Sequence, residues 1–337
     1  MRRYNALTLA RDNEKNSPTR RSAPLSAKGL CGLFLPTTTP FLSDGSLDVV
    51  GLRGNIRKWN QTHISGYVML GSTGERVHLD EREYVQVIEE ARQEIPSHLI
   101  LIAGAGQQST YGTIAEIKRA AAAGVDAVLV ITPNFYRAAI TPDALIKHYS
   151  EVAEASPVPV ILYSMPDLTG IKIEPKQAAA LSTHPNIIGI KDSSADIERL
   201  GETVDLVRNA GVGPADFAVL TGNGTVLFEA LTARADGAIL AVGCAAPALC
   251  LEIIEAFRNQ DHARSQTLQA SLTPLARAVT KTYGIGGLKA ALDLIGYTGG
   301  EVRAPLRAPG AEAREEIQSH LTVAESAVRE LLLKVVV

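Results

Sequence analysis

The amino-acid sequence predicts an α/β fold: a (β/α)8 TIM barrel with a C-terminal helical extension. Short apolar runs with the length and β-branched content of buried strands alternate with longer segments of helical periodicity. Eight such runs occur between residues 29 and 245, close to the roughly 250 residues of a typical barrel. From Pro247 onward the pattern is wholly helical. We therefore expect a disordered or targeting tail at 1–28, the barrel at 29–245 and the helical extension at 246–337.

Each predicted strand is a run of mainly aliphatic residues that ends in small or polar ones. Pro175 favours the start of the helix between the fifth and sixth strands, because proline suits the first turn of a helix. The alternation predicts parallel strands joined by crossover helices. In chain order the predicted strands are 32–35, 66–70, 99–103, 127–131, 160–162, 187–190, 217–220 and 237–240, and the helical patterns fall at about 47–62, 80–94, 110–123, 142–155, 175–182, 196–209 and 223–233.

Composition and charge exclude several classes of function. Of the 337 residues, 46% are hydrophobic, which supports a large core. A net charge of −3 gives no basic footprint for nucleic acid, and no apolar run approaches the ~20 residues of a membrane span. Three cysteines without metal-type spacing suit a reducing compartment, so we expect a cytoplasmic protein. The Arg-rich residues 1–28 are either a disordered tail or a transit peptide, which would make the protein mitochondrial.

One reactive side chain follows each of two neighbouring predicted strands. Tyr163 follows the fifth strand and Lys191 follows the sixth. Neighbouring parallel strands lie about 4.8 Å apart, and barrel enzymes place their active sites at the C-terminal ends of the strands. We therefore expect these two side chains to meet at one mouth of the barrel.

The pair suits Schiff-base chemistry. A lysine at a buried strand end is desolvated, which favours the neutral amine, and a neutral amine can attack a ketone. The adjacent C–C bond can then be made or broken, provided that a group such as the Tyr163 phenol moves protons. The alternative is that Lys191 is a solvated strand-end lysine and Tyr163 a half-buried barrel tyrosine.

Other strand ends add polar groups to the same rim. The segment 71–75, GSTGE, offers the hydroxyls of Ser72 and Thr73 and free backbone N–H groups for a carboxylate, although such clusters are also ordinary turns. The fourth strand ends in TPNFYR, with Phe135 and Tyr136, and the seventh ends in the small, polar TGNGT. An anion cradle, a phenol and a lysine on one rim predict a keto-acid site.

Metal and dinucleotide chemistry lack support in the sequence. HExxH and CxxC are absent, and the seven histidines are scattered, so no metal is expected. Gly104-Ala-Gly106 stops short of a dinucleotide fingerprint, and GIGGLK (284–289) is too short for a P-loop. We expect the glycines of GIGGLK to break or pack the C-terminal helices. No cofactor is expected beyond a covalent Schiff base on Lys191.

Four segments resemble the signature segments of the pyruvate-dependent class I aldolase family, which includes dihydrodipicolinate synthase and N-acetylneuraminate lyase. They are GSTGE, TPNFYR, LYSMPDLTG and GIKDSS, and the resemblance spans about 29–306 in order. The segment from 278 to 306 is most similar to the 4-hydroxy-2-oxoglutarate aldolase branch, and fungal 3-deoxy-hexulosonate aldolases are similar too. The resemblance implies a barrel with a C-terminal helical extension and a homo-oligomer, tetramer or dimer.

The resemblance also implies roles for individual residues. Lys191 forms the Schiff base with pyruvate or a 2-keto acid, and Tyr163 relays protons. Ser72 and Thr73 bind the keto-acid carboxylate, with Ser72 assisting the relay, and Ser193 contacts the substrate.

Two substrate-binding positions depart from the family pattern. Leu168, after Asp167, stands where the synthase has an arginine for the aldehyde's carboxylate, and leucine makes no charge-assisted bond. Phe135 stands where relatives have a tyrosine that a neighbouring subunit contributes to the relay.

The sequence therefore predicts a carbon–carbon lyase that acts on small molecules. It would cleave a 4-hydroxy-2-keto acid to pyruvate and an aldehyde, the substrate being 4-hydroxy-2-oxoglutarate, which similarity favours, or a 3-deoxy-hexulosonate, which the local charge at Asp167 favours. Two alternatives stay open. One is condensation of pyruvate with an aldehyde, as in dihydrodipicolinate synthase. The other is a non-catalytic barrel that binds a keto acid.

Overall fold

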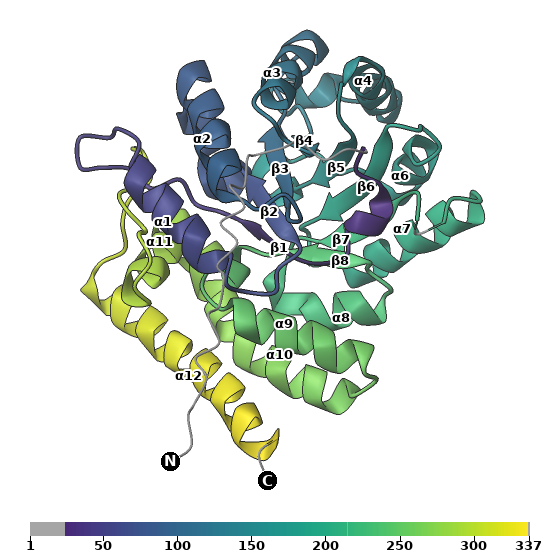
Figure 1. Cartoon of the computed structure of the whole chain (residues 1–337). Helices are drawn as coiled ribbons and strands as arrows, with labels where there is room; N and C mark the ends of the chain where they lie inside the picture. The colour runs from purple at the N-terminus through teal and green to yellow at the C-terminus, as the bar shows by residue number, and fades with distance from the viewer. Residues whose placement is uncertain (1–23, 214, 336–337) are drawn as a thin grey trace, which may run out of the picture.

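A computed structural model describes residues 24–213 and 215–335. Eight parallel strands close into a barrel in sequence order, with β1 paired to both β2 and β8 (Figure 1). The predicted (β/α)8 barrel is thus confirmed, and every predicted strand is present. The strands are β1 (Gly32–Pro36), β2 (Gly66–Met69), β3 (Ile100–Ala105), β4 (Ala127–Ile131), β5 (Val160–Ser164), β6 (Ile187–Asp192), β7 (Ala218–Thr221) and β8 (Gly237–Ile239).

The helices surround the barrel close to their predicted positions. Several begin with the expected caps: the Asp80 side chain accepts from the N–H of Glu83 at the start of α2, and Pro175 opens α6. The helices that follow β1 to β7 are α1 (Val49–Trp59), α2 (Glu81–Glu94), α3 (Thr110–Ala122), α4 (Pro142–Ala155), α5 (Pro166–Thr169), α6 (Pro175–Leu181), α7 (Ile197–Asn209) and α8 (Leu227–Thr232).

Two reactive residues lie inside strands and not after them, which corrects the predicted boundaries. β5 continues through Tyr163 to Ser164, and β6 continues through Lys191 to Asp192. Tyr163 and Lys191 are direct partners in the ladder between these strands. Their polar side chains did not end the strands because the backbone pairing continues past them. The two side chains are therefore held by the sheet itself.

The interior of the barrel is filled by one apolar cluster, and a short N-terminal segment belongs to it. Inward residues such as Phe34, Leu129 and Leu220 share this cluster with Leu25 and Ala27. Leu25 and Ala27, near the end of the predicted tail, are thus buried, whereas residues 1–23 lie outside the described part of the chain. The division of the chain at residues 28 and 245 stays a prediction.

The C-terminal region is helical except for a strap at 295–310, so the predicted wholly helical pattern is wrong there. Gly296 and Gly300 adopt positive φ, and a side chain on Gly299 would collide with the carbonyl of Lys289. Such glycines let the strap turn and lie close against the preceding helix. The helices of this region are α9 (Pro247–Arg258), α10 (His262–Arg277), α11 (Gly284–Leu294) and α12 (Ala311–Val335), with a π-helical turn, η7 (Ala278–Thr282), before α11.

Glycines also pack α11, as the sequence predicted. A side chain on Gly286 would collide with the Arg307 carbonyl of the strap, and one on Gly287 would lie 2.5 Å from Cβ of Tyr283. In Figure 1 the long α12 (yellow) crosses α9, α10 and α11, against which it packs. The C-terminal helices therefore form a layer on one side of the barrel.

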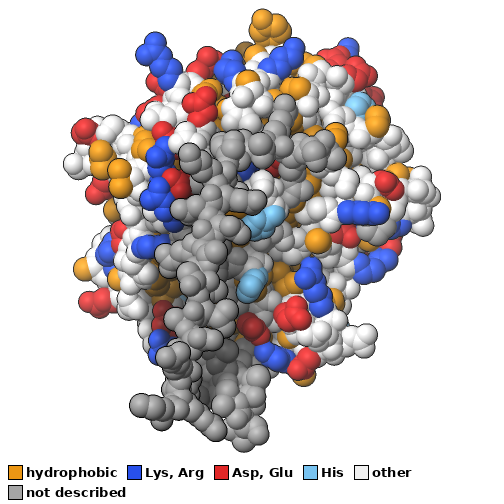
Figure 2. Space-filling model, viewed as in Figure 1, with side chains coloured by type: hydrophobic (Ala, Val, Ile, Leu, Met, Phe, Trp, Pro, Cys, Tyr) orange, Lys and Arg blue, Asp and Glu red, His pale blue; other side chains and the backbone are white. Residues whose placement is uncertain are grey.

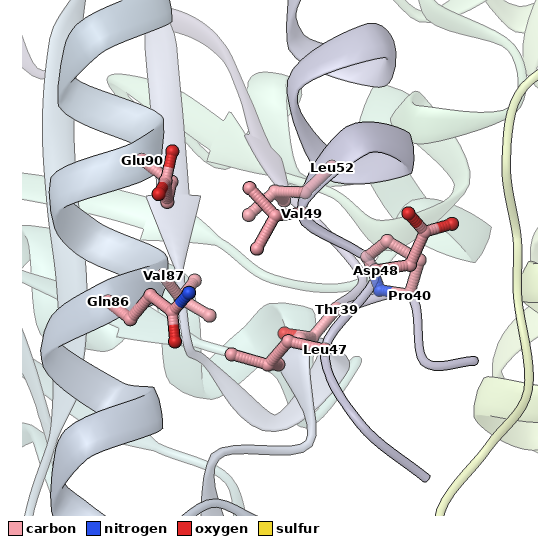
Figure 3. Close-up of a pocket in the computed structure, with 9 residues that line it drawn as sticks. All are labelled: Thr39, Pro40, Leu47, Asp48, Val49, Leu52, Gln86, Val87 and Glu90. Atoms are coloured by element: carbon pink, nitrogen blue, oxygen red, sulfur yellow. The ribbon is translucent and has the colours of Figure 1, made fainter. Parts of the chain in front are cut away.

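The crevice between the first two helices offers no room for a ligand. This crevice, between α1 and α2, is too small for a water molecule (Figure 3). On the visible part of the face in Figure 2, basic and acidic side chains are interspersed, so charge is not gathered there. None of the helices in the described part of the chain is long and apolar enough to cross a membrane. The crevice is lined by Thr39, Pro40, Leu47, Asp48, Val49, Leu52, Gln86, Val87 and Glu90.

Candidate active site

The candidate active site is built on the C-terminal ends of β5 and β6, where Tyr163 and Lys191 meet. The Lys191 Nζ lies 4.4 Å from the centroid of the Tyr163 ring. Both side chains are buried, with exposures of 4% for Tyr163 and 5% for Lys191. The alternative of a solvated strand-end lysine is therefore wrong. A cation placed against an aromatic face is also attracted by the ring quadrupole, which helps to fix the lysine in this position.

The loop after β2 brings a hydroxyl to the same place. The Oγ of Ser72 lies 3.3 Å from the phenol oxygen of Tyr163, and either atom can donate. Leu70, just before this loop, has a positive φ of 58°, and a side chain on Gly104 of β3 would collide with its carbonyl. The glycine thus lets the strained turn lie close to β3. Tyr163 therefore contacts Ser72 through its hydroxyl and Lys191 through the face of its ring.

Thr73 and Ser193 are both buried, and each lies within two residues of a site residue in the sequence. Thr73 follows Ser72 in the short η2 (Ser72–Gly74), and Ser193 follows β6 two residues after Lys191. Gly222, after β7, borders both Ser193 and the lysine: a side chain on it would collide with Ser193 Oγ and would lie 2.6 Å from Lys191 Cε. Sequence reasoning noted the TGNGT segment but did not single out Gly222, whose bare backbone leaves room beside the lysine.

Phe135 and Leu168 lie at the exposed rim, with 74% and 57% exposure. The Phe135 ring packs edge-on against Tyr136 at 5.0 Å, and its N–H donates to the side chain of Gln108. Because both side chains are exposed while Lys191 and Tyr163 are buried, these two predicted substrate-binding residues are not brought into the buried part of the site. Leu168 belongs to α5, the short turn directly after β5.

The carboxylate next to Lys191 in the chain is used elsewhere. Asp192 is buried and pairs with Arg199 of α7, with 3.0 Å between its Oδ2 and the guanidinium. Within the described residues, no carboxylate lies within 4.0 Å of the Lys191 Nζ. The lysine therefore faces a phenol ring and a glycine, and a substrate carbonyl would not have to displace an ion-pair partner from its nitrogen.

Among the residues that the structure describes, no group of three or more His, Cys, Asp or Glu side chains is placed to hold a metal ion. The expectation that neither metal nor cofactor is needed stays a prediction.

Comparison with known proteins places the chain among pyruvate aldolases. Residues 29–324 match the dihydrodipicolinate synthetase family. A 4-hydroxy-tetrahydrodipicolinate synthase from Methanothrix thermoacetophila is 34% identical over 291 residues, covering 86% of this chain and 96% of the relative. A similar synthase from Methanoculleus marisnigri is 33% identical over 277 residues, covering 82% and 92%.

Solved structures agree with these sequence matches. Dihydrodipicolinate synthase from Thermotoga maritima has a TM-score of 0.82 and 29% identity, covering 88% of this chain and 99% of that one. A prophage protein of the dihydrodipicolinic acid synthase family from E. coli K12, solved in complex with pyruvate, has a TM-score of 0.81 and 27% identity, covering 88% and 98%. Together with the barrel and its contacts among lysine, tyrosine and serine, these matches show that the chain belongs to the dihydrodipicolinate synthetase family, whose members are carbon–carbon lyases.

Proposed function

We propose that the chain catalyses a pyruvate-dependent aldol reaction in which Lys191 forms a Schiff base with the keto carbon. The observation that carries this proposal is the position of the buried Lys191, whose Nζ lies 4.4 Å from the centroid of the Tyr163 ring. The hydroxyl of Tyr163 in turn lies 3.3 Å from Ser72 Oγ. Family membership and the E. coli relative solved in complex with pyruvate support the proposal.

In this proposal, each side chain has one task. The neutral amine of Lys191 attacks the keto carbon, water leaves, and the resulting iminium draws electrons from C3, so that loss of a C3 proton gives an enamine. The enamine then attacks the aldehyde carbon, and hydrolysis returns the lysine. Tyr163 gives and takes the protons of these steps, with Ser72 as its partner. Thr73 and Ser193 supply hydroxyls for the keto-acid carboxylate.

The comparisons favour the condensation of pyruvate with an aldehyde over the cleavage reaction that the sequence placed first. The relatives from Methanothrix thermoacetophila and Methanoculleus marisnigri both bear the name 4-hydroxy-tetrahydrodipicolinate synthase. The finer resemblance to 4-hydroxy-2-oxoglutarate and 3-deoxy-hexulosonate aldolases stays a prediction. Arg137 adds a positive charge for an anionic aldehyde, because its guanidinium packs over Gly170, two residues after Leu168; its Nη1 lies 3.1 Å from a Cβ placed on that glycine.

Cleavage of a 4-hydroxy-2-keto acid is the second candidate, and Leu168 favours it. An exposed leucine follows Asp167 where an arginine would bind the carboxylate of a synthase substrate, and leucine offers no hydrogen bond to that group. Cleavage reverses the bond-forming step and uses the same lysine, tyrosine and serine.

One assay in each direction tests the proposal. Pyruvate consumption is measured with a series of aldehydes, and pyruvate release is measured with 4-hydroxy-2-oxoglutarate and with a 3-deoxy-hexulosonate. We expect the wild type to turn over in at least one direction and Lys191→Ala in neither. Turnover by the lysine variant at the wild-type rate would contradict the proposal, as would a well-folded wild type that is inactive with every substrate.

We also propose that the chain forms a homo-oligomer through its exposed apolar rim, defined as Val77, Tyr111, Phe135 and Tyr136. Each of these side chains is at least 72% exposed. Gln108 links Val77 and Phe135, since it lines one cavity together with Val77 and accepts the Phe135 N–H, and Tyr111 follows it in the first turn of α3. Exposed apolar side chains that gather on one surface are typical of an interface between subunits.

A further inference from the structure

The loop that carries Ser72 and Thr73 is fastened by Glu75, which follows it. Glu75 is only 2% exposed and has a left-handed backbone with φ of 54°. A residue with a side chain adopts this conformation only where its surroundings hold it there. Thr39, from the segment after β1, donates its Oγ1 to the Gly74 carbonyl at 2.8 Å. The Glu75 carboxylate itself has one local contact, with His78 Nδ1 at 3.2 Å from Oε2, and two contacts with the C-terminal part of the chain.

Lys289 of α11 holds one oxygen of that carboxylate. Its Nζ lies 2.6 Å from Glu75 Oε1, and both side chains are almost fully buried. The same Nζ donates to the carbonyl of Glu301 at 2.5 Å and lies 4.5 Å from the centroid of the Phe41 ring. The lysine is therefore bound to the loop after β2 and to the strap at 295–310 at once.

Arg303 of the strap holds the other oxygen. Its backbone N–H donates to Glu75 Oε2 at 3.1 Å. Its guanidinium packs on the Phe41 ring at 4.2 Å and donates to the His78 carbonyl at 2.7 Å and to Glu83 Oε2 at 2.6 Å. Arg303 thus binds the strap to the segment 75–83 through Glu75, His78 and Glu83.

We propose that Lys289 and Arg303 are positioning residues for the keto-acid carboxylate. They hold Glu75, and Glu75 sets the turn that presents the Ser72 and Thr73 hydroxyls. The C-terminal extension therefore contributes to pyruvate binding without touching the ligand. This inference rests on the proposed function, because it assumes that those hydroxyls bind a keto acid.

The contacts among Glu75, Lys289 and Arg303, here called the clamp, could instead serve only to stabilise the fold, and an experiment can separate the two roles. Breaking a buried ion pair destabilises any fold, so a lower melting temperature alone does not separate the two roles. The separating quantity is the pyruvate concentration that half-saturates borohydride trapping on Lys191. A positioning role changes this concentration, whereas a structural role changes only the melting temperature.

The experiment compares three variants with one control. Glu75→Gln removes the charge that Lys289 pairs with. Arg303→Gln keeps the backbone N–H that donates to Glu75 but removes the guanidinium that fixes the strap to His78 and Glu83, and the fold tolerates this loss more easily because Arg303 is less buried. Glu75→Gln combined with Lys289→Met removes both buried charges and leaves neither unpaired. Asp236→Asn is the control, because it removes a partly buried ion pair with Arg208 just before β8, at the opposite end of the strands.

We expect each clamp variant to raise the half-saturating pyruvate concentration roughly tenfold, which corresponds to about one lost oriented hydrogen bond, and the adduct yield at saturation to stay the same. The variant with both Glu75→Gln and Lys289→Met should have a higher melting temperature than Glu75→Gln alone, but its half-saturating pyruvate concentration should stay raised. Asp236→Asn should lower the melting temperature only. Half-saturation within twofold of wild type in the folded Arg303→Gln protein would overturn the inference. An adduct missing from the wild type would instead overturn the proposed function and this inference with it.

Discussion

At the scale of single residues, Tyr163 is the group that separates chemistry from binding. Its phenol oxygen is next to Ser72, and its ring lies against Lys191. Tyr163→Phe keeps the ring and removes the proton. We expect kcat to fall by about 10²- to 10⁴-fold, the usual contribution of a positioned acid or base. The rise in melting temperature that pyruvate causes should persist. A kcat within tenfold of wild type would show that another group carries the proton.

Arg137 tests the charge of the aldehyde. Arg137→Gln removes the cation beside α5, so kcat/KM for an aldehyde with a carboxylate should fall at least tenfold, while that for a neutral aldehyde stays within twofold. Arg234→Gln is the matched control, since Arg234 lies on the loop before β8 and pairs with Asp205 of α7. Equal losses for both kinds of aldehyde would contradict a role of Arg137 in charge recognition.

The sequence predicted those site residues whose position follows from barrel topology alone, because the C-terminal ends of all strands meet at one mouth of the barrel. Tyr163 and Lys191 come at the ends of adjacent strands, and barrel topology then requires them to meet. The clamp was not predictable, because Glu75 and Arg303 are 228 residues apart. No periodicity links a loop after β2 to a strap after α11. Only the packed structure shows that a buried glutamate at positive φ needs these partners.

At the scale of elements, strands were predicted to within a few residues because aliphatic runs ending in small residues leave little choice. The strap at 295–310 was missed, since its glycines and prolines lie between two strongly helical patterns. The ends of β5 and β6 were also each predicted two residues too early. In both cases, backbone pairing or packing at a distance, and not local composition, decides the boundary.

His148 on α4 makes the stability of its element depend on pH. Its Nδ1 lies 2.9 Å from Thr110 Oγ1, its Nε2 is buried without a hydrogen-bond partner, and burial lowers the pKa of His148 below 6.5, against a smaller opposite effect of Glu151. Above the unfolded-state pKa, both states are neutral at this site. Below it, the unfolded chain binds a proton that the folded chain resists, so the free energy of unfolding decreases as pH falls.

His148→Gln should remove this dependence. Melting temperatures measured from pH 7.5 to 5.5 should fall less steeply in the variant than in wild type. Identical slopes in the two proteins would contradict the assignment.

At the scale of the whole molecule, the exposed apolar rim predicts an assembly of identical chains. A charge in an apolar interface is costly to desolvate. Tyr111→Glu should therefore shift the mass found by light scattering after size exclusion toward the monomer, and Lys147→Glu, on an exposed part of α4, is the control. A monomeric wild type at micromolar concentration would contradict the proposed oligomer.

The most direct test of the account is borohydride trapping with pyruvate, followed by intact mass and peptide mapping, on wild type and Lys191→Ala. If Lys191 forms the Schiff base, a pyruvate-derived adduct appears on Lys191 in the wild type and no adduct appears in the variant. A well-folded wild type that traps nothing, or an adduct on a different lysine, would contradict Schiff-base catalysis at this site. The first of these results would favour a barrel that no longer catalyses the reaction of its family.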